Sequence, residues 1–379
     1  AHILIILIVH DSLVGRTSSQ TLTGPMEHFC AVEDGYSFSF HVPRTFHNYT
    51  LAEQSHNGNI KTFDSSDGSP SVVIKRFANP FASIKRAQLI HRELNLLRNL
   101  RHENIVRLIT SYTAQDESNS EESIYHSTEY CGETLSKKIE QGQYSMEYAK
   151  KWIRELLRAI YYLTINRVAH RNIHPGIICI DFNNKLRLTD FGMDIDRGKE
   201  GTNTLYMPLE QLLEWRSADG EKVDVWSVSA LLCELITGRP LFENHKNTIL
   251  QQIEYCGSID LDVLNTMASD NERSALMEKS YRIERKDFIE ILRVTMMPER
   301  GINRADLVEN EDTLRDFIEN TLQFNPHRRM SVGEALSHDF LLPLGDLPSE
   351  PALPADEKRA MLALRQRITR EIEAAPVGR

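Results

Sequence analysis

Six short motifs stand in a fixed order along the chain, and this order constrains the fold more than any other feature. They are a strand-like run that ends at Lys75, a helix-like stretch with Glu93, His170-Arg171-Asn172, Asp190-Phe191-Gly192, Pro208-Leu209-Glu210 and Asp224-Val225-Trp226-Ser227. Each motif is weak alone, since a lysine at a strand end is usually a solvated surface residue. Chance does not easily assemble the whole series in this order.

The apolar pattern divides the chain into a smaller part with strands and a larger helical part. Side-chain type and turn residues predict strands at residues 71–75, 105–109, 124–127, 178–180 and 186–188. Apolar residues at helical spacing predict helices at residues 87–97, 146–166, 225–236, 317–324 and 332–337. After these, residues 343–354 read as an acidic, Pro-rich surface tail and residues 356–373 as an exposed charged helix.

Composition narrows the functional class. The 379 residues are 41% hydrophobic and 26% charged, which is typical of a globular protein with room for two lobes. A net charge of −10 argues against general binding to nucleic acid or to an anionic membrane surface. The five cysteines are scattered without a CxxC pair, which indicates reduced thiols and neither a disulfide framework nor a zinc site. We therefore expect a cytoplasmic or nuclear location, or both.

The first residues contain an apolar run, residues 3–9. This run is too short to span a bilayer, which takes about 20 residues. It also lacks the preceding basic stretch of a signal peptide. We interpret residues 1–25 as a fragment edge or a gene-model extension, with a membrane anchor as the alternative.

The motif series resembles that of eukaryotic protein kinases, from about residue 42 to residue 351. Within them the chain is similar to mitogen-activated protein (MAP) kinases, particularly the stress-activated, osmosensing type. The stretches that carry this likeness are residues 79–83, 92–106, 223–228, 237–242 and 261–269. The resemblance implies an α+β, bilobal protein-kinase fold with a small, mostly antiparallel β N-lobe and a larger helical C-lobe.

The expected domain boundaries follow from the same resemblance. Residues 1–37 would be an N-terminal extension, disordered or not native, before an N-lobe at residues 38–132. The C-lobe would occupy residues 133–342. An acidic, Pro-rich tail with a terminal helix would occupy residues 343–379.

The resemblance also implies roles for individual residues. The nucleotide-binding residues would be Lys75, its ion-pair partner Glu93, the gatekeeper Thr128 and the hinge residues Glu129 and Cys131. Asp190 would bind Mg²⁺, and the structural residues would be Leu97, His170 and Phe191 of a hydrophobic spine, Asp224 under the catalytic loop, and the pair Glu210 and Arg329.

A docking stretch is implied in the tail. Asp346 and Glu350 would receive basic peptides of upstream kinases, substrates or phosphatases, and Ser349 replaces one acid of this stretch. The alternative is a solvated acidic turn without a partner.

The catalytic loop departs from the kinase pattern at three positions. Asn172 stands where the family has the proton-accepting aspartate, and an amide cannot accept the substrate's proton. His174 replaces the lysine that steadies the phosphate, and Ile177 replaces the asparagine that holds a second Mg²⁺. We read Asn172 as an isostere that preserves the fold. The alternative reading of His174 is a substitute base.

Two further segments depart from the pattern. The region of the glycine-rich loop, residues 51–60, contains only Gly58, so side chains would keep its backbone from the phosphates. The activation segment is short, and Tyr206 fits better as the tyrosine just before the Pro-Leu-Glu motif than as a phosphorylated residue.

Three functional hypotheses follow. The preferred one is a pseudokinase of the MAP kinase type that acts as a binding or regulatory module in stress signalling, with binding of ATP and Mg²⁺ weakened or lost. The second is a protein serine/threonine kinase with residual ATP-dependent phosphotransfer. The third is a switch that binds ATP without transferring phosphate.

Overall fold

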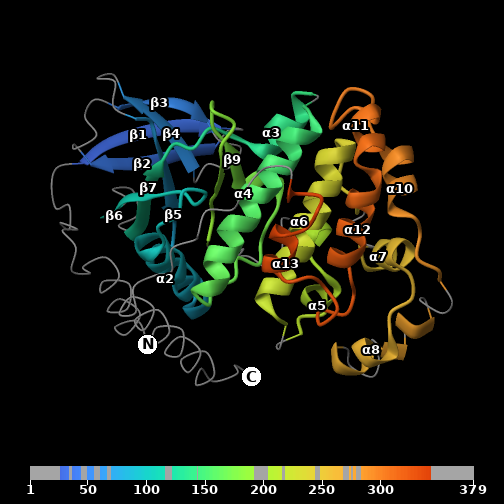
Figure 1. Cartoon of the computed structure of the whole chain (residues 1–379). Helices are drawn as coiled ribbons and strands as arrows, with labels where there is room; N and C mark the ends of the chain where they lie inside the picture. Colours follow the sequence, from blue (N-terminus) through green and yellow to red (C-terminus); the bar gives the residue numbers. More distant parts are fainter. Residues whose placement is uncertain are drawn as a thin grey trace.

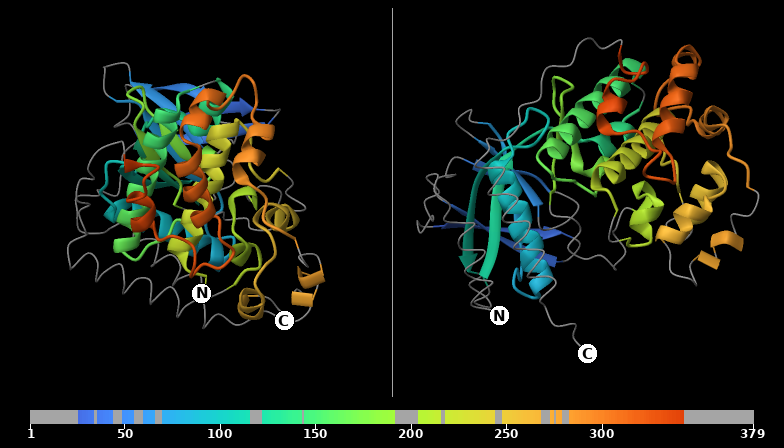
Figure 2. Two further views of the ribbon diagram at one scale, coloured as in Figure 1. Left: turned by 45° about the vertical axis from the view of Figure 1, so that its right-hand side comes forward. Right: turned by 60° about the horizontal axis from the view of Figure 1, so that its bottom comes forward.

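A computed structural model of the chain describes residues 26–342, except residues 34–35, 44–48, 55–59, 66–69, 116–121, 143, 192–203, 216–217, 244–247, 268–272, 275 and 279–282. Most strands gather in one lobe and most helices in the other (Figure 1). Figure 2 shows the same division from two other sides. The predicted α+β, bilobal fold is therefore confirmed.

The elements of the described chain follow one another in two groups. The strands are β1 (Met26–Glu33), β2 (Tyr36–Pro43), β3 (Tyr49–Gln54), β4 (Ile60–Ser65), β5 (Val72–Phe77), β6 (Leu108–Gln115), β7 (Glu122–Glu129), β8 (Glu133–Thr134), β9 (Ile178–Ile180) and β10 (Leu186–Leu188). The longer helices are α2 (Ile84–Asn99), α4 (Met146–Ile165), α6 (Gly220–Thr237), α7 (Thr248–Cys256), α10 (Phe288–Thr295) and α12 (Glu311–Thr321). The shorter ones are α3 (Leu135–Glu140), α5 (Leu209–Leu212), α8 (Leu261–Met267), α11 (Arg304–Glu309), α13 (Val332–Leu336) and the 3₁₀ turns η2 (Pro175–Ile177) and η3 (Thr204–Tyr206).

A five-stranded antiparallel sheet forms the N-lobe, in the order β3-β4-β5-β7-β6. Helix α2 packs on it, with Ile90 and Leu94 in one apolar cluster with Phe77 of β5 and Ile124 of β7. Ser83 caps the start of this helix, and its side chain accepts a hydrogen bond from the backbone N–H of Arg86. The sheet and this helix thus present Lys75 and Glu93 to each other.

An antiparallel hairpin, β1 with β2, precedes the sheet. It runs across residue 37, where we had placed the boundary between a disordered extension and the N-lobe. The pairing of β1 with β2 begins at Met26 and crosses that boundary, and the division into domains stays a prediction. The two strands flank Asp34-Gly35 in the sequence, a dipeptide typical of two-residue hairpin turns.

The C-lobe is built around α4 and α6, which lie side by side (Figure 1). Helix α6 is buried nearly all round, as its continuous apolar sequence predicts. Its first turn is capped by the side chain of Asp219, and it ends at Gly238, which has φ of +80°. This central helix carries Asp224 and Trp226 to the site.

A small sheet in the order β10-β9-β8 lies between the lobes. The backbone connects it to the N-lobe segment, because Val106 N–H donates to the carbonyl of Leu188 at 3.0 Å and Leu188 N–H donates to that of Asn104 at 2.8 Å. The segment before β9 carries His170 to Ile177, and Asp190 follows β10.

The predicted helices and short strands agree with the structure to within a few residues at most ends. The larger shifts concern residues 105–109, where β6 begins only at Leu108 and Ile105 forms an isolated bridge with Leu188, and residues 317–324, where α12 already begins at Glu311. Residues 343–379, with the predicted tail helix, lie outside the described residues. No helix in the described part of the chain is both long and apolar enough to cross a membrane.

Candidate active site

Lys75 joins three elements at the centre of the candidate site. Its ammonium lies 2.9 and 3.1 Å from the two carboxylate oxygens of Glu93 on α2, and 2.6 Å from Asp190, which follows β10. Burial alone would lower the pKa of Lys75, but the charges of Asp190 and Glu93 outweigh it and hold that pKa above its ordinary value. Burial alone would raise the pKa of Asp190, but the positive charge of Lys75 outweighs burial and lowers this pKa to about 2.

His126 belongs to the same cluster and was missed from the sequence. Its Nε2 lies 3.3 Å from Glu93 Oε1, and both side chains are buried. His126 stands directly opposite Lys75 in the pairing of β5 with β7, so the two side chains share one face of the sheet. The strand register would have revealed it, but the sequence alone does not fix that register.

The predicted spine residues are buried together. Leu97 and Phe191 belong to the main apolar core, and the ring of His170 lies 5.0 Å from that of Phe191. His170 Nε2 lies 3.0 Å from the carbonyl oxygen of Thr189. Burial lowers the pKa of His170 to about 4, so this ring is neutral near pH 7 and serves packing.

Asp224 holds the backbone of the His170–Ile177 segment, as predicted. Its carboxylate accepts hydrogen bonds from the N–H groups of His170 at 2.8 Å and Arg171 at 2.6 Å. These two hydrogen bonds hold Arg171 at φ of +65°, an uncommon conformation for a residue with a side chain. Burial raises the pKa of Asp224 to about 7 even though these two bonds oppose the rise.

The three altered positions of this segment have distinct environments. Asn172 is buried, and its side chain is an amide where the kinase pattern has a carboxylate. His174 is half-buried, and its Nδ1 accepts from the N–H of Gly176 at 3.2 Å. Burial lowers the pKa of His174 to about 4. A neutral ring whose Nδ1 is already an acceptor is a poor proton acceptor, which weakens the interpretation of His174 as a substitute base.

Ile177 lies inside the main apolar core, with 5% of its surface exposed. Its carbonyl oxygen accepts from both the N–H and the hydroxyl of Thr189, at 3.0 and 2.8 Å. The side chain offers no oxygen to a metal ion, and its place is already filled by packing.

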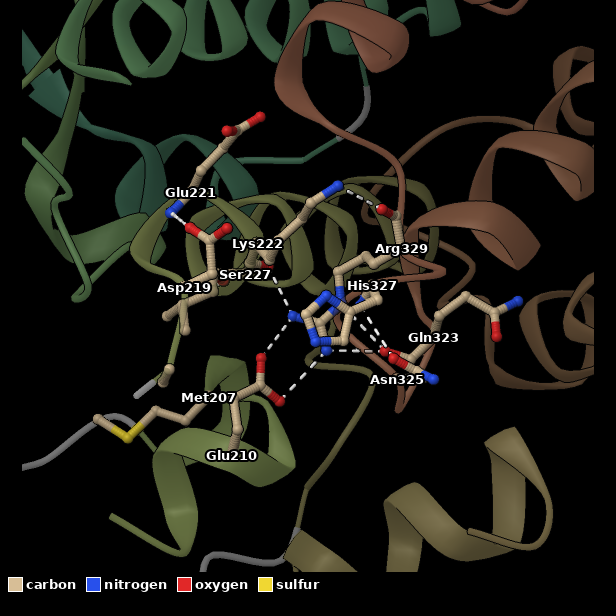
Figure 3. A network of polar contacts seen from close by, with 12 residues as sticks. Met207, Glu210, Asp219, Glu221, Lys222, Ser227, Gln323, Asn325, His327 and Arg329 are labelled. Atoms are coloured by element: carbon tan, nitrogen blue, oxygen red, sulfur yellow. Dashed lines mark hydrogen bonds and ion pairs between the residues drawn. The ribbon is translucent and has the colours of Figure 1, made fainter. Parts of the chain in front are cut away.

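Glu210 and Arg329 form the predicted buried ion pair, and Figure 3 shows how they face each other. The guanidinium donates to the two carboxylate oxygens at 2.6 and 3.2 Å, and to the carbonyl oxygens of Gln323 and Lys222. Its face covers Trp226 of α6. The pair ties the start of α5 to α6 and to the segment after α12.

Comparison with known proteins matches these features to one family. The model of the protein kinase domain matches residues 56–341. The chain belongs to the protein kinase family. It is 30% identical to the mitogen-activated protein kinase HOG1A of Wallemia ichthyophaga, over 79% of this chain and 81% of that protein. It is also 30% identical to the mitogen-activated protein kinase HOG1 of Beauveria bassiana, over 76% of this chain and 75% of that protein. It is 28% identical to HOG1 of Chaetomium globosum, over 82% of this chain and 85% of that protein. The predicted resemblance is confirmed.

In kinase terms, Thr128 to Cys131 form the hinge between the lobes. Thr128 and Cys131 are buried, while Glu129 turns its carboxylate to Arg187 at 2.5 Å and toward Arg107 at 3.8 Å. The side chain of Glu129 is thus committed to protein contacts, and its backbone N–H donates to the carbonyl oxygen of Arg107 at 3.1 Å. The assignment of these residues to nucleotide binding stays a prediction.

The end of the kinase activation segment is firmly packed. Tyr206 is 4% exposed, its hydroxyl donates to Glu234 of α6, and its carbonyl oxygen accepts from the Ser227 hydroxyl at 2.8 Å. Burial raises the pKa of Glu234 to about 7. These contacts agree with a structural tyrosine and leave its hydroxyl inaccessible to a modifying enzyme.

Some predicted features lie outside the described residues. These are Gly58 of the glycine-rich loop, residues 192–203 of the activation segment, and Asp346 and Glu350 of the docking stretch.

Protein kinases use ATP with Mg²⁺, and the residues of this site fit that pair only in part. Asp190 supplies carboxylate chemistry suited to one Mg²⁺, and Lys75 supplies one cation for phosphate. Ile177 supplies nothing for a second ion, and His174 is neutral near pH 7. The site therefore brings fewer metal ligands and fewer cations than an active kinase does.

Proposed function

We propose that this protein is a pseudokinase of the MAP kinase type, which acts as a binding or regulatory module in stress signalling. One observation carries the proposal: the catalytic loop keeps its kinase scaffold while its reactive positions are replaced. Asp224 still holds the loop backbone, yet Asn172 lacks a carboxylate and Ile177 packs into the core. Loss of a general base alone typically slows a reaction by about 10²–10⁴-fold.

The partners we propose are signalling proteins with basic docking peptides, received by the acidic tail with Asp346 and Glu350. A net charge of −10 favours such basic partners over nucleic acid and over anionic membranes. We place the protein in the cytoplasm, the nucleus or both.

Residual phosphotransfer is the second candidate function. It is favoured by the complete Lys75–Glu93–Asp190 cluster, which in kinases positions the phosphates and one metal ion. The same cluster favours the third candidate, a switch that binds ATP without using it.

A phosphotransfer assay on the purified chain separates the first two candidates. We expect no transfer above that of the Lys75→Met variant, with a basic protein and with a MAP kinase docking peptide as acceptors. Robust transfer that Lys75→Met abolishes would overturn the proposal.

Asn172→Asp alone should not restore ordinary kinase rates, because Ile177 and His174 remain. We expect the variant to stay at least about 10²-fold below an active MAP kinase in the same assay. Recovery to ordinary rates would show that one residue was the whole defect.

A further inference from the structure

Two cysteines contact each other where the hinge meets the C-lobe. Cys131 is the last hinge residue before Gly132 and is buried, whereas Cys179 lies on β9 and is half-buried. Their thiols share a hydrogen bond, and this bond together with burial raises the pKa of the Cys131 thiol well above its ordinary value. Cys131 is therefore a protonated thiol beside a more accessible one, and both are free.

The strand pairing directs the Cys179 side chain toward the hinge. The middle strand of the small sheet is β9, and Cys179 stands opposite Thr134 of β8 and Arg187 of β10. Directly opposed residues of antiparallel strands project from the same face of a sheet. Arg187 reaches the hinge from this face, since its Nη1 lies 2.5 Å from Glu129 Oε1. Cys179 thus projects from the face of the sheet on which the hinge lies.

The backbone holds the hinge close to β9. Gly132, directly after Cys131, has φ of +100°, and a Cβ atom there would lie 2.1 Å from the carbonyl oxygen of Ile180, directly after Cys179. Only glycine permits this approach. The two cysteines therefore flank a backbone contact that is too close for any side chain.

We propose that Cys131 and Cys179 form a reversible disulfide when the protein meets a peroxide, and that this bond locks the hinge to β9. Disulfides of this transient kind act in redox sensing in compartments that keep most thiols reduced. The inference does not depend on the proposed function, because the bond requires neither nucleotide nor phosphotransfer. Phosphotransfer activity of the reduced chain would overturn the proposed function and leave this inference standing.

Hydrogen peroxide is the oxidant for this bond. The Cys179 sulfur attacks one peroxide oxygen, the O–O bond breaks, and a sulfenic acid forms while one water leaves. The Cys131 sulfur then attacks the Cys179 sulfur. An S–S bond forms, and the Cys131 proton leaves with the sulfenic hydroxyl as a second water. The two sulfurs have then lost the two electrons that the peroxide gains, and a dithiol reductant reverses the change.

Peptide mapping of the full chain tests the disulfide. Trypsin cleaves after Lys and Arg and places each of the five cysteines on a separate peptide. After treatment with hydrogen peroxide, we expect mass spectrometry to find the Cys131 and Cys179 peptides linked, and dithiothreitol to separate them. Absence of the linked pair, or irreversible oxidation of Cys179 without it, would overturn the inference.

Cys233 on α6 and Cys256 on α7 are an internal control. They lie near enough for the charge of one to act on the other, but Cys233 is fully buried. Burial raises the pKa of the Cys233 thiol and brings that of Cys256 to about 12, so neither thiol ionises near pH 7. We expect their peptides to stay unlinked under the same treatment. Equal linkage of this pair would contradict the selectivity that we assign to Cys131 and Cys179.

Hydrogen exchange and thermal unfolding test the lock. The oxidised parent should exchange its amide hydrogens at residues 131–134 more slowly than the reduced parent, and unfold at a higher temperature. Cys179→Ser cannot form the bond and should show neither change, which also controls for oxidation of methionine. If this variant does not fold, Cys131→Ser serves the same purpose. A linked chain with unchanged exchange and unfolding would overturn the lock.

Discussion

At the scale of single residues, Arg328 and Arg329 are adjacent in the chain but form ion pairs in opposite environments. Arg329 and Glu210 are fully buried, whereas Arg328 meets Asp260 at 3.0 Å with both side chains exposed. A buried charge that loses its partner has no water to replace it, while an exposed pair is screened by solvent. The environment, more than the pairing, decides what each contributes to stability.

We expect Glu210→Ala to lower the free energy of unfolding by about 3–5 kcal/mol, because it leaves the Arg329 guanidinium buried without its carboxylate. Arg328→Ala should lower it by less than about 1 kcal/mol. Urea denaturation followed by circular dichroism measures both. Similar losses for the two variants would show that burial does not govern these pairs.

At the scale of elements, α6 organises the C-lobe side of the site. Its residues hold the catalytic loop through Asp224 and the end of the activation segment through Ser227 and Glu234. Two of these three are carboxyl groups that burial shifts to a pKa of about 7. One helix thus combines the scaffold of the site with groups that titrate near neutral pH.

The raised pKa of Glu234 makes stability depend on pH. The folded chain binds this proton up to a pH of about 7, whereas the unfolded chain releases it near the ordinary value of 4.5. The free energy of unfolding contributed by Glu234 therefore falls as pH rises between these values. Asp224 acts in the same direction.

Glu234→Gln tests this pH dependence, since its amide oxygen still accepts from the Tyr206 hydroxyl but cannot ionise. We expect the variant to lose less stability than the parent between about pH 5 and about pH 8 in urea denaturation. The exposed Glu254→Gln on α7 should follow the parent curve. Parallel curves for the parent and Glu234→Gln would contradict the assignment.

The contact of the hinge with β9 depends on the absence of a side chain at Gly132. Gly142 has a similar backbone, with φ of +130°, but its nearest neighbour to a Cβ would lie 3.6 Å away, against 2.1 Å at Gly132. We expect Gly142→Ala to cost about 1–2 kcal/mol from backbone strain alone. Gly132→Ala should cost more, because the pairing of β8 with β9 must also shift. Thermal unfolding compares the two, and equal costs would contradict the close approach.

At the scale of the whole molecule, hydrogen bonds and ion pairs join the lobes at the site. Lys75 of the sheet reaches Asp190, Arg92 of α2 donates to the carbonyl of Ala169 at 2.9 Å, and Val106 N–H donates to that of Leu188. Lys75 differs from the others because it binds α2, the sheet and the C-lobe at once.

Lys75→Met should therefore loosen the N-lobe relative to the C-lobe. We expect faster amide hydrogen exchange in α2, because buried Glu93 loses its ammonium partner and Asp190 is released. Lys286→Met, which breaks an exposed pair with Glu254, should leave exchange in α2 unchanged. Unchanged protection of α2 in Lys75→Met would show that the apolar contacts alone hold the helix.

The sequence predicts the helices and the central strands of this molecule because their apolar periodicity reflects burial directly. Helix α4 and the strands β9 and β10 begin and end within a residue of the predicted positions. The ion pairs of Lys75 and Arg329 were predictable only through the family resemblance, because their partners lie far away in the sequence.

Two features were not predicted, for different reasons. The β1–β2 hairpin carries a turn signal in Asp34-Gly35. It was not predicted because residues 1–37 were interpreted together as an N-terminal extension. His126 carries no signal of its own, since its place beside Glu93 follows from the register of β5 with β7. A register is a long-range property, and a single sequence does not specify it.

The packing of Ile177 also affects which substitutions at this site an evolving chain can accept. A return to asparagine would bury an amide where the core is filled by hydrocarbon, at a cost of about 1–3 kcal/mol. Until Asn172 and His174 had also reverted, that cost would bring no catalytic gain. Under the function proposed above, a descendant of this chain would gain phosphotransfer only through an intermediate that is less stable and not yet more active. Selection for stability alone would then oppose the first of these substitutions.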